Sequence, residues 1–246
     1  MTSALWFPIN LLQLVFTLSW SMACITLALL ARLATGSTRP GFWMARWLWA
    51  PPLLFFGPFP QRVRGAEKVD WSRPCVVVSN HQSFLDIPLL FRALPTPLHF
   101  VVKSELRSVP FLGWYIRAME MIFVDRSNPE AARLSIERTA DALRSGKSVL
   151  LFPEGTRSRD GRVGGFKAGM LAAAIASSAP LVPVAVEGPG RAMPRGWPRF
   201  RPTRLRVAVG EPIPTEDAAP KDRRALAARV HQEVLRLHGE LVSGAE

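Results

Sequence analysis

The sequence predicts an α/β fold, a mixed and largely parallel sheet flanked by helices, with an N-terminal membrane-anchoring helix hairpin. Two observations carry this prediction. Apolar runs with strand and helix periods alternate from about residue 69 onward, as expected of an α/β core. Before Arg32 there is no Lys, Arg, Asp or Glu, and the 246 residues suffice for one sizeable core and an appendage. We therefore expect an anchor over residues 1–62 and an α/β domain over residues 63–246.

The expected anchor has two apolar blocks. Residues 4–30 exceed the roughly 20 residues needed to cross a bilayer. They lack a basic n-region and are followed by no clear cleavage site, so we expect them to stay on the mature protein, with a buried core helix as the alternative. Residues 42–59 contain Arg46 and the pair Pro51-Pro52, which disfavour a regular spanning helix. Three tryptophans there favour the headgroup level, so this block predicts an interfacial or re-entrant segment.

The core elements follow in order along the chain. Strands are expected at 75–79, 99–102, 121–124, 148–152, 181–186 and 204–209. Helices are expected at 86–93, 111–119, 129–145, 166–178 and 220–242. Open sheets of this kind bind ligands at the carboxyl ends of their strands, so we look for functional residues directly after each strand.

Residues 80–86, Asn-His-Gln-Ser-Phe-Leu-Asp, follow the first of these strands. His81 and Asp86 are five positions apart, and five helical residues rotate by about 500°, which leaves the ends roughly 140° apart. The two side chains meet if His81 lies on the turn and Asp86 in the first turn of the helix. The carboxylate then orients one ring nitrogen and leaves the other free to take a proton. Ser83 and Asp86 also fit a capping box, so a purely structural role for the carboxylate stays open.

Three more blocks accompany this motif: Met-Ile-Phe-Val-Asp-Arg at 121–126, Phe-Pro-Glu-Gly-Thr-Arg-Ser at 152–158 and Leu-Val-Pro-Val at 181–184. Their order and separation resemble the four motif blocks of the glycerolipid acyltransferases with the NHxxxxD motif, specifically the 1-acyl-glycerol-3-phosphate acyltransferase family. The resemblance covers residues 75–186. It implies an acyltransferase that moves a fatty acyl group from acyl-ACP or acyl-CoA to the free hydroxyl of 1-acyl-glycerol-3-phosphate, giving phosphatidic acid in phospholipid biosynthesis.

Acyl transfer to an alcohol needs a base, and we expect His81 with Asp86 to supply it. The substrate hydroxyl is itself the nucleophile, so we expect direct transfer without an acyl-enzyme. A phosphate cradle is expected from cations near strand ends, namely Lys103, Arg126 and Arg157.

The resemblance implies that Arg126 and the block Glu154, Gly155, Thr156 and Arg157 bind the acceptor, with help from Lys167. Glu154 either hydrogen-bonds a glycerol hydroxyl or pairs with an arginine, and we favour the hydroxyl.

One departure from the family pattern leaves the acceptor open. Six positions before Arg126 the family usually shows glycine, whereas this chain has Glu120. A carboxylate there is expected to repel a phosphate or to favour a cationic head group. The alternatives are therefore an acyltransferase for another lysolipid, such as lyso-ornithine lipid, and a non-catalytic lipid-binding relative.

The net charge of +12 suits an anionic membrane surface or an acidic carrier protein, and no nucleic-acid motif is present, so we expect no nucleic-acid partner. Cys24 and Cys75 are expected to be small buried hydrophobes. His231 and His238 are expected on a solvated helix face, and we expect no metal or other cofactor.

The location expected is the cytoplasmic (inner) membrane, with the α/β domain facing the cytoplasm. Arginines flank both blocks, and the positive-inside rule keeps such residues cytoplasmic. We therefore expect the hairpin to bind one membrane face, with a single crossing as the alternative.

Overall fold

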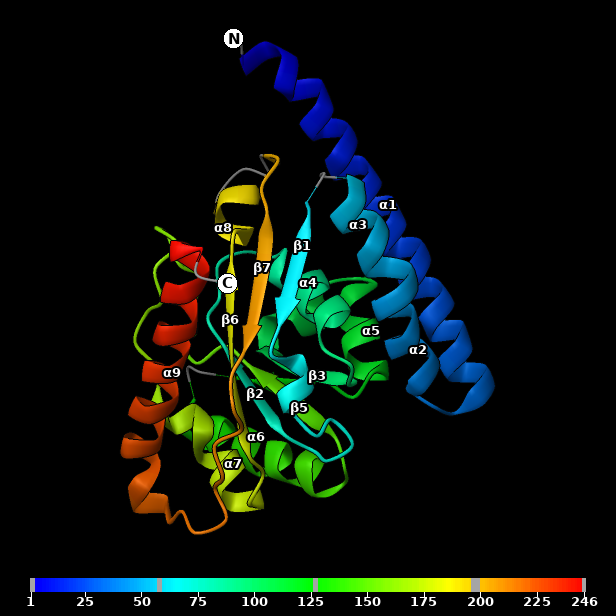
Figure 1. The fold of residues 1–246 in the computed structure, drawn as a ribbon. Helices are drawn as coiled ribbons and strands as arrows, with labels where there is room; N and C mark the ends of the chain where they lie inside the picture. The colour runs from blue at the N-terminus through cyan, green and yellow to red at the C-terminus, as the bar shows by residue number, and fades with distance from the viewer. Residues whose placement is uncertain (1–2, 57–58, 126–127, 196–199, 245–246) are drawn as a thin grey trace.

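The computed structural model describes residues 3–56, 59–125, 128–195 and 200–244. Within these residues seven strands form one sheet, in the order β1-β7-β6-β2-β5-β3-β4 (Figure 1). They are β1 (Gln61–Arg64), β2 (Val76–Ser79), β3 (Leu98–Lys103), β4 (Ile122–Val124), β5 (Ser148–Leu151), β6 (Leu181–Glu187) and β7 (Leu205–Val209). Neighbours in the sheet are parallel except for the antiparallel pair β6 and β7. The prediction of a mixed, largely parallel sheet is confirmed.

The helices flank this sheet. They are α1 (Ser3–Thr35), α2 (Arg39–Met44), α3 (Ala50–Phe56), α4 (Asp86–Ala93), α5 (Leu112–Ala118), α6 (Pro129–Arg144), α7 (Ala172–Ser177), α8 (Pro189–Ala192) and α9 (Arg223–Ser243). Helix α4 has the bounds that the sequence predicts. Helix α6 begins after Asn128, whose side-chain oxygen accepts the N–H groups of Glu130 and Ala131 and so caps the helix. The last two predicted helices each open with a 3₁₀ turn, η4 (Ala168–Leu171) and η5 (Pro220–Asp222).

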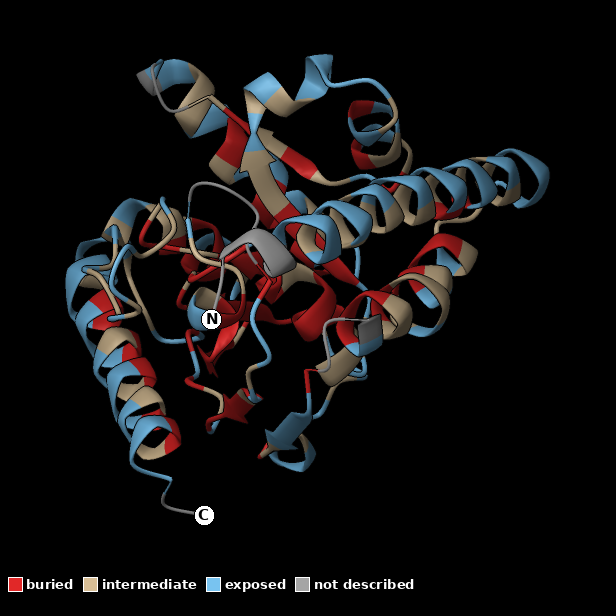
Figure 2. Ribbon diagram, turned by 90° about the horizontal axis from the view of Figure 1, so that it is seen from above, coloured by how far each residue is buried: buried red, intermediate tan, exposed pale blue. Residues whose placement is uncertain are grey.

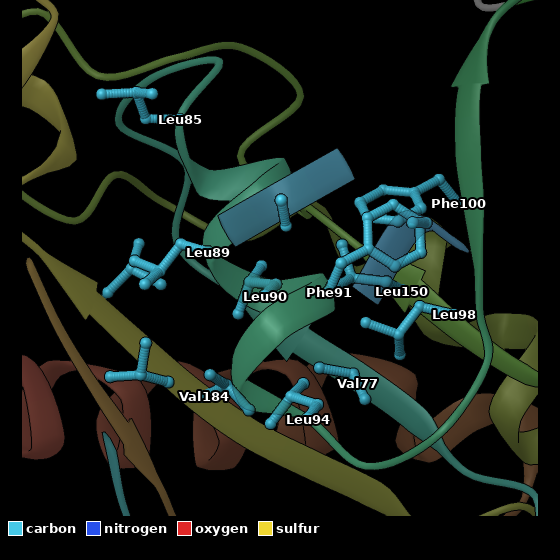
Figure 3. Packing of buried hydrophobic residues seen from close by; sticks show 14 of the residues in the cluster. Val77, Leu85, Leu89, Leu90, Phe91, Leu94, Leu98, Phe100, Leu150 and Val184 are labelled. Carbon is cyan, nitrogen blue, oxygen red and sulfur yellow. The ribbon is translucent and has the colours of Figure 1, made fainter. Parts of the chain in front are cut away.

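The central strand β2 is buried on both faces. Val77 belongs to the cluster that holds α4, whereas Val76 and Val78 belong to the cluster under α6, α7 and α9. This alternation follows from the two-residue period of a strand. Figure 3 shows Leu89 and Leu90 of α4, and Leu94 directly after the helix, lying near strand residues that include Val77 and Val184. The turn that leaves β2 therefore starts from a strand that is buried at every residue.

The second apolar block is helical and packs on the α/β domain. Phe42, Ala50 and Leu54 are buried in the same cluster as α4, while Trp43 and Phe55 stay exposed on the other side. A π-helical turn, η1 (Ala45–Trp49), lies directly before the proline pair. Because two consecutive prolines remove two backbone donors, the wider turn adjusts the helix before them. The break expected at these prolines is thus a local change of helix type.

Helix α1 is the one helix among the described residues that is long and apolar enough to cross a membrane. It packs against α2, η1 and α5, and many of its apolar side chains face away from the domain. Figure 2 shows exposed residues along this helix from Phe7 onward, in contrast to the buried strands at the centre of the molecule.

Among the described residues, one strand and one α-helix of the α/β domain were not predicted. Strand β1 pairs with β7 at the edge of the sheet, and three of its four residues are exposed. It begins at Gln61, so the boundary expected between residues 62 and 63 falls inside it. The other is α8, a single helical turn after β6.

Candidate active site

The structure brings His81 and Asp86 together where β2 gives way to α4. His81 lies on the connecting turn and Asp86 is the first residue of the helix, so the ring Nδ1 is 2.6 Å from the carboxylate Oδ2. The same oxygen accepts the backbone N–H groups of Gln82 and Ser83, at 2.7 and 3.0 Å. Asp86 thus orients the imidazole and also holds the backbone of the turn before α4. The helix itself begins after Leu85 without a side-chain cap, so Ser83 and Asp86 do not cap α4.

The imidazole of His81 is mostly buried, but part of it remains accessible to solvent. Its side chain is 16% exposed, whereas Asp86 is fully buried. The ring stacks on Phe152 with 4.0 Å between centroids and 14° between planes. With Nδ1 directed at the carboxylate, the structure shows no hydrogen-bond partner for Nε2 in the described part of the chain. That nitrogen is the one available to take a proton from a substrate.

The 152–158 segment holds the backbone of the same turn. The carboxylate Oε1 of Glu154 accepts the N–H of His81 at 2.9 Å, and the N–H of Ser158 donates to the His81 carbonyl at 2.7 Å. Glu154 is 8% exposed, and this burial raises the pKa of its carboxyl group. Hydrogen bonds from the N–H groups of His81 and Gly164 act in the opposite direction. The two motifs that the sequence places 70 residues apart are therefore in direct contact.

Gly155 lets this segment turn back sharply. Its φ of +75° lies in the left-handed region that favours glycine, and its N–H donates to the carbonyl of Phe152. Thr156 after it is exposed, and Arg157 is half-buried with its guanidinium carbon 4.0 Å from the ring centroid of Phe84. Burial, and after it the like charge of Arg195, lower the pKa of Arg157. A bound anion would therefore stabilise the charged guanidinium group of Arg157.

The other predicted cations sit further out. Lys103 is exposed at the end of β3, which β5 separates from β2, and its Nζ is 3.9 Å from Glu105. Lys167 is also exposed, with its backbone N–H bonded to the carbonyl of Pro153. Arg126 lies outside the described residues. The structure therefore brings Arg157 to the His81 turn and leaves Lys103 and Lys167 on the surface.

Glu120 corrects one expectation. It lies before the start of β4, whereas His81 lies after the end of β2. Since these strands run in the same direction, the two residues are at opposite ends of the strands. Its carboxylate pairs with Arg32 at 3.1 Å and with Lys147 at 2.7 Å. The idea that it repels an acceptor phosphate is wrong, because it faces neither Arg157 nor the His81 turn. Its φ of +56° explains the glycine usual in the family, since glycine adopts that conformation without strain.

Two side chains of the turn have roles that the sequence did not reveal. The buried amide of Asn80 bonds both backbone groups of Val186, its Nδ2 donating to the carbonyl at 2.9 Å and its Oδ1 accepting the N–H at 2.8 Å. The amide of Gln82 bonds the Gly161 carbonyl at 2.9 Å and the Gly190 N–H at 3.2 Å. A polar amide directly after a buried strand was the available signal for Asn80.

The C-terminal helix also reaches this turn. His238 on α9 places its Nε2 3.2 Å from the side-chain nitrogen of Gln82, and burial lowers the pKa of this histidine. His231 packs its ring against Phe166. The expectation of a solvated face was wrong for both histidines, because helical spacing alone does not show which face the sheet covers.

Known proteins resemble this chain chiefly over the segment that contains the His81 turn and the 152–158 segment. A family model described as "Acyltransferase" matches residues 61–187. The 1-acyl-sn-glycerol-3-phosphate acyltransferase BAT2, chloroplastic, of Brassica napus is 38% identical over 151 residues, or 61% of this chain and 43% of that protein. The 1-acyl-sn-glycerol-3-phosphate acyltransferase of Pseudomonas aeruginosa is 36% identical over 161 residues, or 65% of this chain and 61% of that protein. The chain thus spans about half the length of these curated relatives.

A solved structure matches the whole chain. The crystal structure of the 1-acyl-sn-glycerophosphate (LPA) acyltransferase PlsC from Thermotoga maritima superposes with a TM-score of 0.85 and 25% identity, covering 100% of this chain and 99% of that one. The segment that the family model matches makes up just over half of the 246 residues and contains His81, Asp86, Glu154 and Arg157. The chain belongs to the acyltransferase family.

Proposed function

We propose that this protein transfers a fatty acyl group from a thioester to the free hydroxyl of 1-acyl-glycerol-3-phosphate and so makes phosphatidic acid. The observation that carries the proposal is the pair His81 and Asp86 next to Arg157, a cation with no carboxylate partner in the described part of the chain. The first arrangement provides a base, and the second favours an anionic acceptor. The names of the relatives from Brassica napus and Pseudomonas aeruginosa support the same acceptor.

In the proposed reaction Nε2 of His81 takes the hydroxyl proton while the acceptor oxygen attacks the thioester carbonyl carbon. A C–O bond forms, and the tetrahedral intermediate then collapses with cleavage of the C–S bond. The imidazolium returns its proton to the departing thiolate. Asp86 stabilises the imidazolium through Nδ1–H, as the carboxylate does in serine hydrolases. Neither Ser79 nor Ser83 is the proposed nucleophile, because Ser79 donates to the Asn80 carbonyl and Ser83 to the Met193 carbonyl.

Arg157 is the proposed ligand of the acceptor phosphate, because guanidinium groups bind phosphate oxygens in pairs. Lys103, Arg126 and Lys167 are proposed to add positive charge at the same edge of the sheet, and Gly155 and Thr156 to shape the acceptor pocket. The donor is acyl carrier protein or a coenzyme A thioester, both anionic partners that suit a chain of net charge +12. The alcohol and the thioester bring every atom that the reaction needs, so the proposal includes no metal or prosthetic group.

An acceptor panel tests this proposal. The purified protein in detergent micelles receives a labelled acyl-CoA or acyl-ACP together with 1-acyl-glycerol-3-phosphate, a lyso-aminolipid or a zwitterionic lysophospholipid. We expect label in phosphatidic acid, and none with the His81→Ala variant. Transfer to the lyso-aminolipid alone would replace the acceptor but keep the chemistry. Absence of transfer from either donor to any acceptor would favour the non-catalytic lipid-binding alternative.

We further propose that the protein lies on one face of the inner membrane with its α/β domain in the cytoplasm. Helix α1 is joined to the rest of the chain along its length. Asn10 accepts the N–H of Phe200 at 2.7 Å, Ser21 accepts the indole N–H of Trp49 at 2.9 Å, and Arg32 donates to the Ala118 carbonyl. A helix that left the domain to cross the bilayer would lose the first of these bonds, so they support an anchor that stays beside the domain.

Cysteine labelling tests the orientation. Cys24 and Cys75 are replaced by alanine, and a cysteine is introduced at Thr2 or, as a matched control, at the exposed Ser72 of the α/β domain. We expect a membrane-impermeant maleimide to label both variants only after intact cells are permeabilised. Labelling of the Thr2→Cys variant in intact cells, with the Ser72→Cys variant still protected, would establish the single crossing instead.

A further inference from the structure

We propose that Glu154 is a positioning residue for the His81 turn and does not bind the acceptor. This inference rests on the proposed function and assigns Glu154 differently from the family resemblance, which implies acceptor binding. The carboxylate Oε1 accepts the backbone N–H of His81 at 2.9 Å, and the residue is 8% exposed. A buried carboxylate with this partner is already engaged before any substrate arrives.

The other side of the carboxylate is engaged as well. The N–H of Gly164 also donates to Glu154, and Gly164 lies so close that a Cβ atom there would be 2.9 Å from Oε2. The 152–165 loop therefore folds back over its own glutamate. A glycerol hydroxyl would have to displace one of these two backbone donors to reach the carboxylate.

The position of Glu154 matters because it fixes the backbone of the base. His81 is held on both sides, with its N–H bonded to Glu154 and its carbonyl bonded to the N–H of Ser158 at 2.7 Å. Stacking on Phe152 restrains the ring itself. A general base must sit within hydrogen-bond reach of the proton it removes, so loosening this backbone lowers the rate of proton transfer without touching the acceptor.

Glu154 also adds charge next to the imidazole. The charges of His81 and Asp86 both act on the Glu154 carboxylate. A neutral residue at this position therefore removes a charge beside the turn as well as a backbone contact.

The first test replaces the carboxylate. Glu154→Gln keeps the size of the side chain but removes the charge and turns an N–H₂ group toward one of the two backbone donors. We expect kcat to fall on the order of 10-fold with the acceptor KM within about twofold of wild type, because only the base is displaced. Asp160→Asn, an exposed carboxylate of the same loop, is the matched control and should change neither quantity.

The second test keeps the charge and moves the side chain. Gly164→Ala places a methyl group against Oε2, and we expect the same fall in kcat with an unchanged acceptor KM. The two substitutions act through one contact, so the double variant should lose less than the product of the single losses. A larger acceptor KM in both variants, with kcat unchanged, would overturn the inference and make Glu154 an acceptor ligand.

Hydrogen exchange gives a readout that does not depend on turnover. Mass spectrometry of a peptide containing residues 80–86 should show faster exchange in Glu154→Gln than in wild type, at matched thermal midpoints. Unchanged exchange in both Glu154→Gln and Gly164→Ala would contradict the positioning role. If Glu154→Gln does not fold, the Gly164→Ala variant decides. Failure of wild type to acylate any lysolipid would refute the proposed function, while the exchange experiment would still test the contact itself.

Discussion

The His81 turn, residues 80–86, and the cations at the same edge of the sheet are built in opposite ways. In the turn the polar side chains of Asn80, Gln82 and Asp86 are buried, and they are bonded to β6, to the 152–165 loop and to the backbone of the turn itself. The cations Lys103 and Lys167 stand in solvent. The comparison teaches that the fold fixes the geometry of the His81 turn, whereas it leaves these two lysines without a buried network to hold them.

Physical chemistry explains the difference. A buried polar group costs free energy unless it is hydrogen-bonded, so the turn is stable only with its whole network in place. An exposed lysine keeps its hydration and needs no partner. Substitutions in the turn should therefore affect the rate of transfer, and substitutions among the cations should affect acceptor affinity.

The largest effect is expected in the turn. His81→Ala should lower kcat by about 10²- to 10⁴-fold, which is the usual contribution of a general base, while the protein still folds and inserts. Asp86→Asn should be nearly as damaging, because the oxygen that accepts from the ring and from two backbone N–H groups is altered. Initial rates with a labelled donor measure both variants. Wild-type turnover by His81→Ala would contradict the assignment of the base.

A smaller effect is expected from the cations. Arg157→Ala should raise the acceptor KM by about 10- to 100-fold and leave the donor KM nearly unchanged, because a charge-assisted contact contributes about 1.5–3 kcal/mol. The exposed neighbour Arg159→Ala is the control for loss of one positive charge in the same loop. Lys103→Ala should act in the same direction. A defect confined to the donor KM would assign Arg157 to binding of the acyl donor and would contradict its proposed role in acceptor binding.

Phe84 belongs to the His81 turn but contacts the cation Arg157, so its substitution tests whether a turn residue can affect the acceptor KM. Its ring is 59% exposed and lies under the guanidinium of Arg157. Phe84→Leu should raise the acceptor KM by about two- to fivefold, because an exposed cation–π contact contributes about 0.5–1 kcal/mol, and Phe84→Trp should restore it. A fall in kcat at unchanged acceptor KM would instead place the ring with the catalytic network.

The smallest effect is expected at Glu120, on the opposite edge. Glu120→Gly should leave acceptor preference unchanged, because the residue pairs with Arg32 and Lys147 far from the turn. Glu120→Gln, which weakens the same ion pairs but keeps a side chain at positive φ, should be less stable than Glu120→Gly by about 1 kcal/mol. Denaturant unfolding measures the difference. A changed acceptor preference in Glu120→Gly would reinstate the carboxylate as a selectivity element.

The fold was predictable where burial leaves a strong pattern. The strands β2, β5 and β6 are apolar runs that are buried throughout, and their order along the chain indicates a parallel sheet. Strand β1 was not predicted, because Gln61-Arg62-Val63-Arg64 is an exposed edge strand of low hydrophobicity. The second apolar block was assigned to the interface because of its tryptophans and prolines. A helix was expected there, but the burial of Phe42, Ala50 and Leu54 against the α/β domain was overlooked.

Within the site, residue types and order along the chain were enough to expect that His81 meets Asp86. The contact between Glu154 and the His81 backbone was not predictable, because a sequence does not show that a carboxylate is bonded to a main-chain N–H. The role of Glu120 was misjudged for a related reason. A departure from a family pattern was interpreted as a change in side-chain chemistry, although the position is defined by its backbone conformation.

The packing of α2 and α3 determines how this protein can be handled in water. Removing residues 1–60 would take Phe42, Ala50 and Leu54 out of the core and expose their apolar neighbours on α4 and the sheet. Each such side chain contributes about 1.5–3 kcal/mol when it is a fully buried large hydrophobe, so a chain shortened in this way should aggregate. Detergent-free preparations are better sought by replacing outward-facing residues such as Leu12 and Phe55 with polar ones.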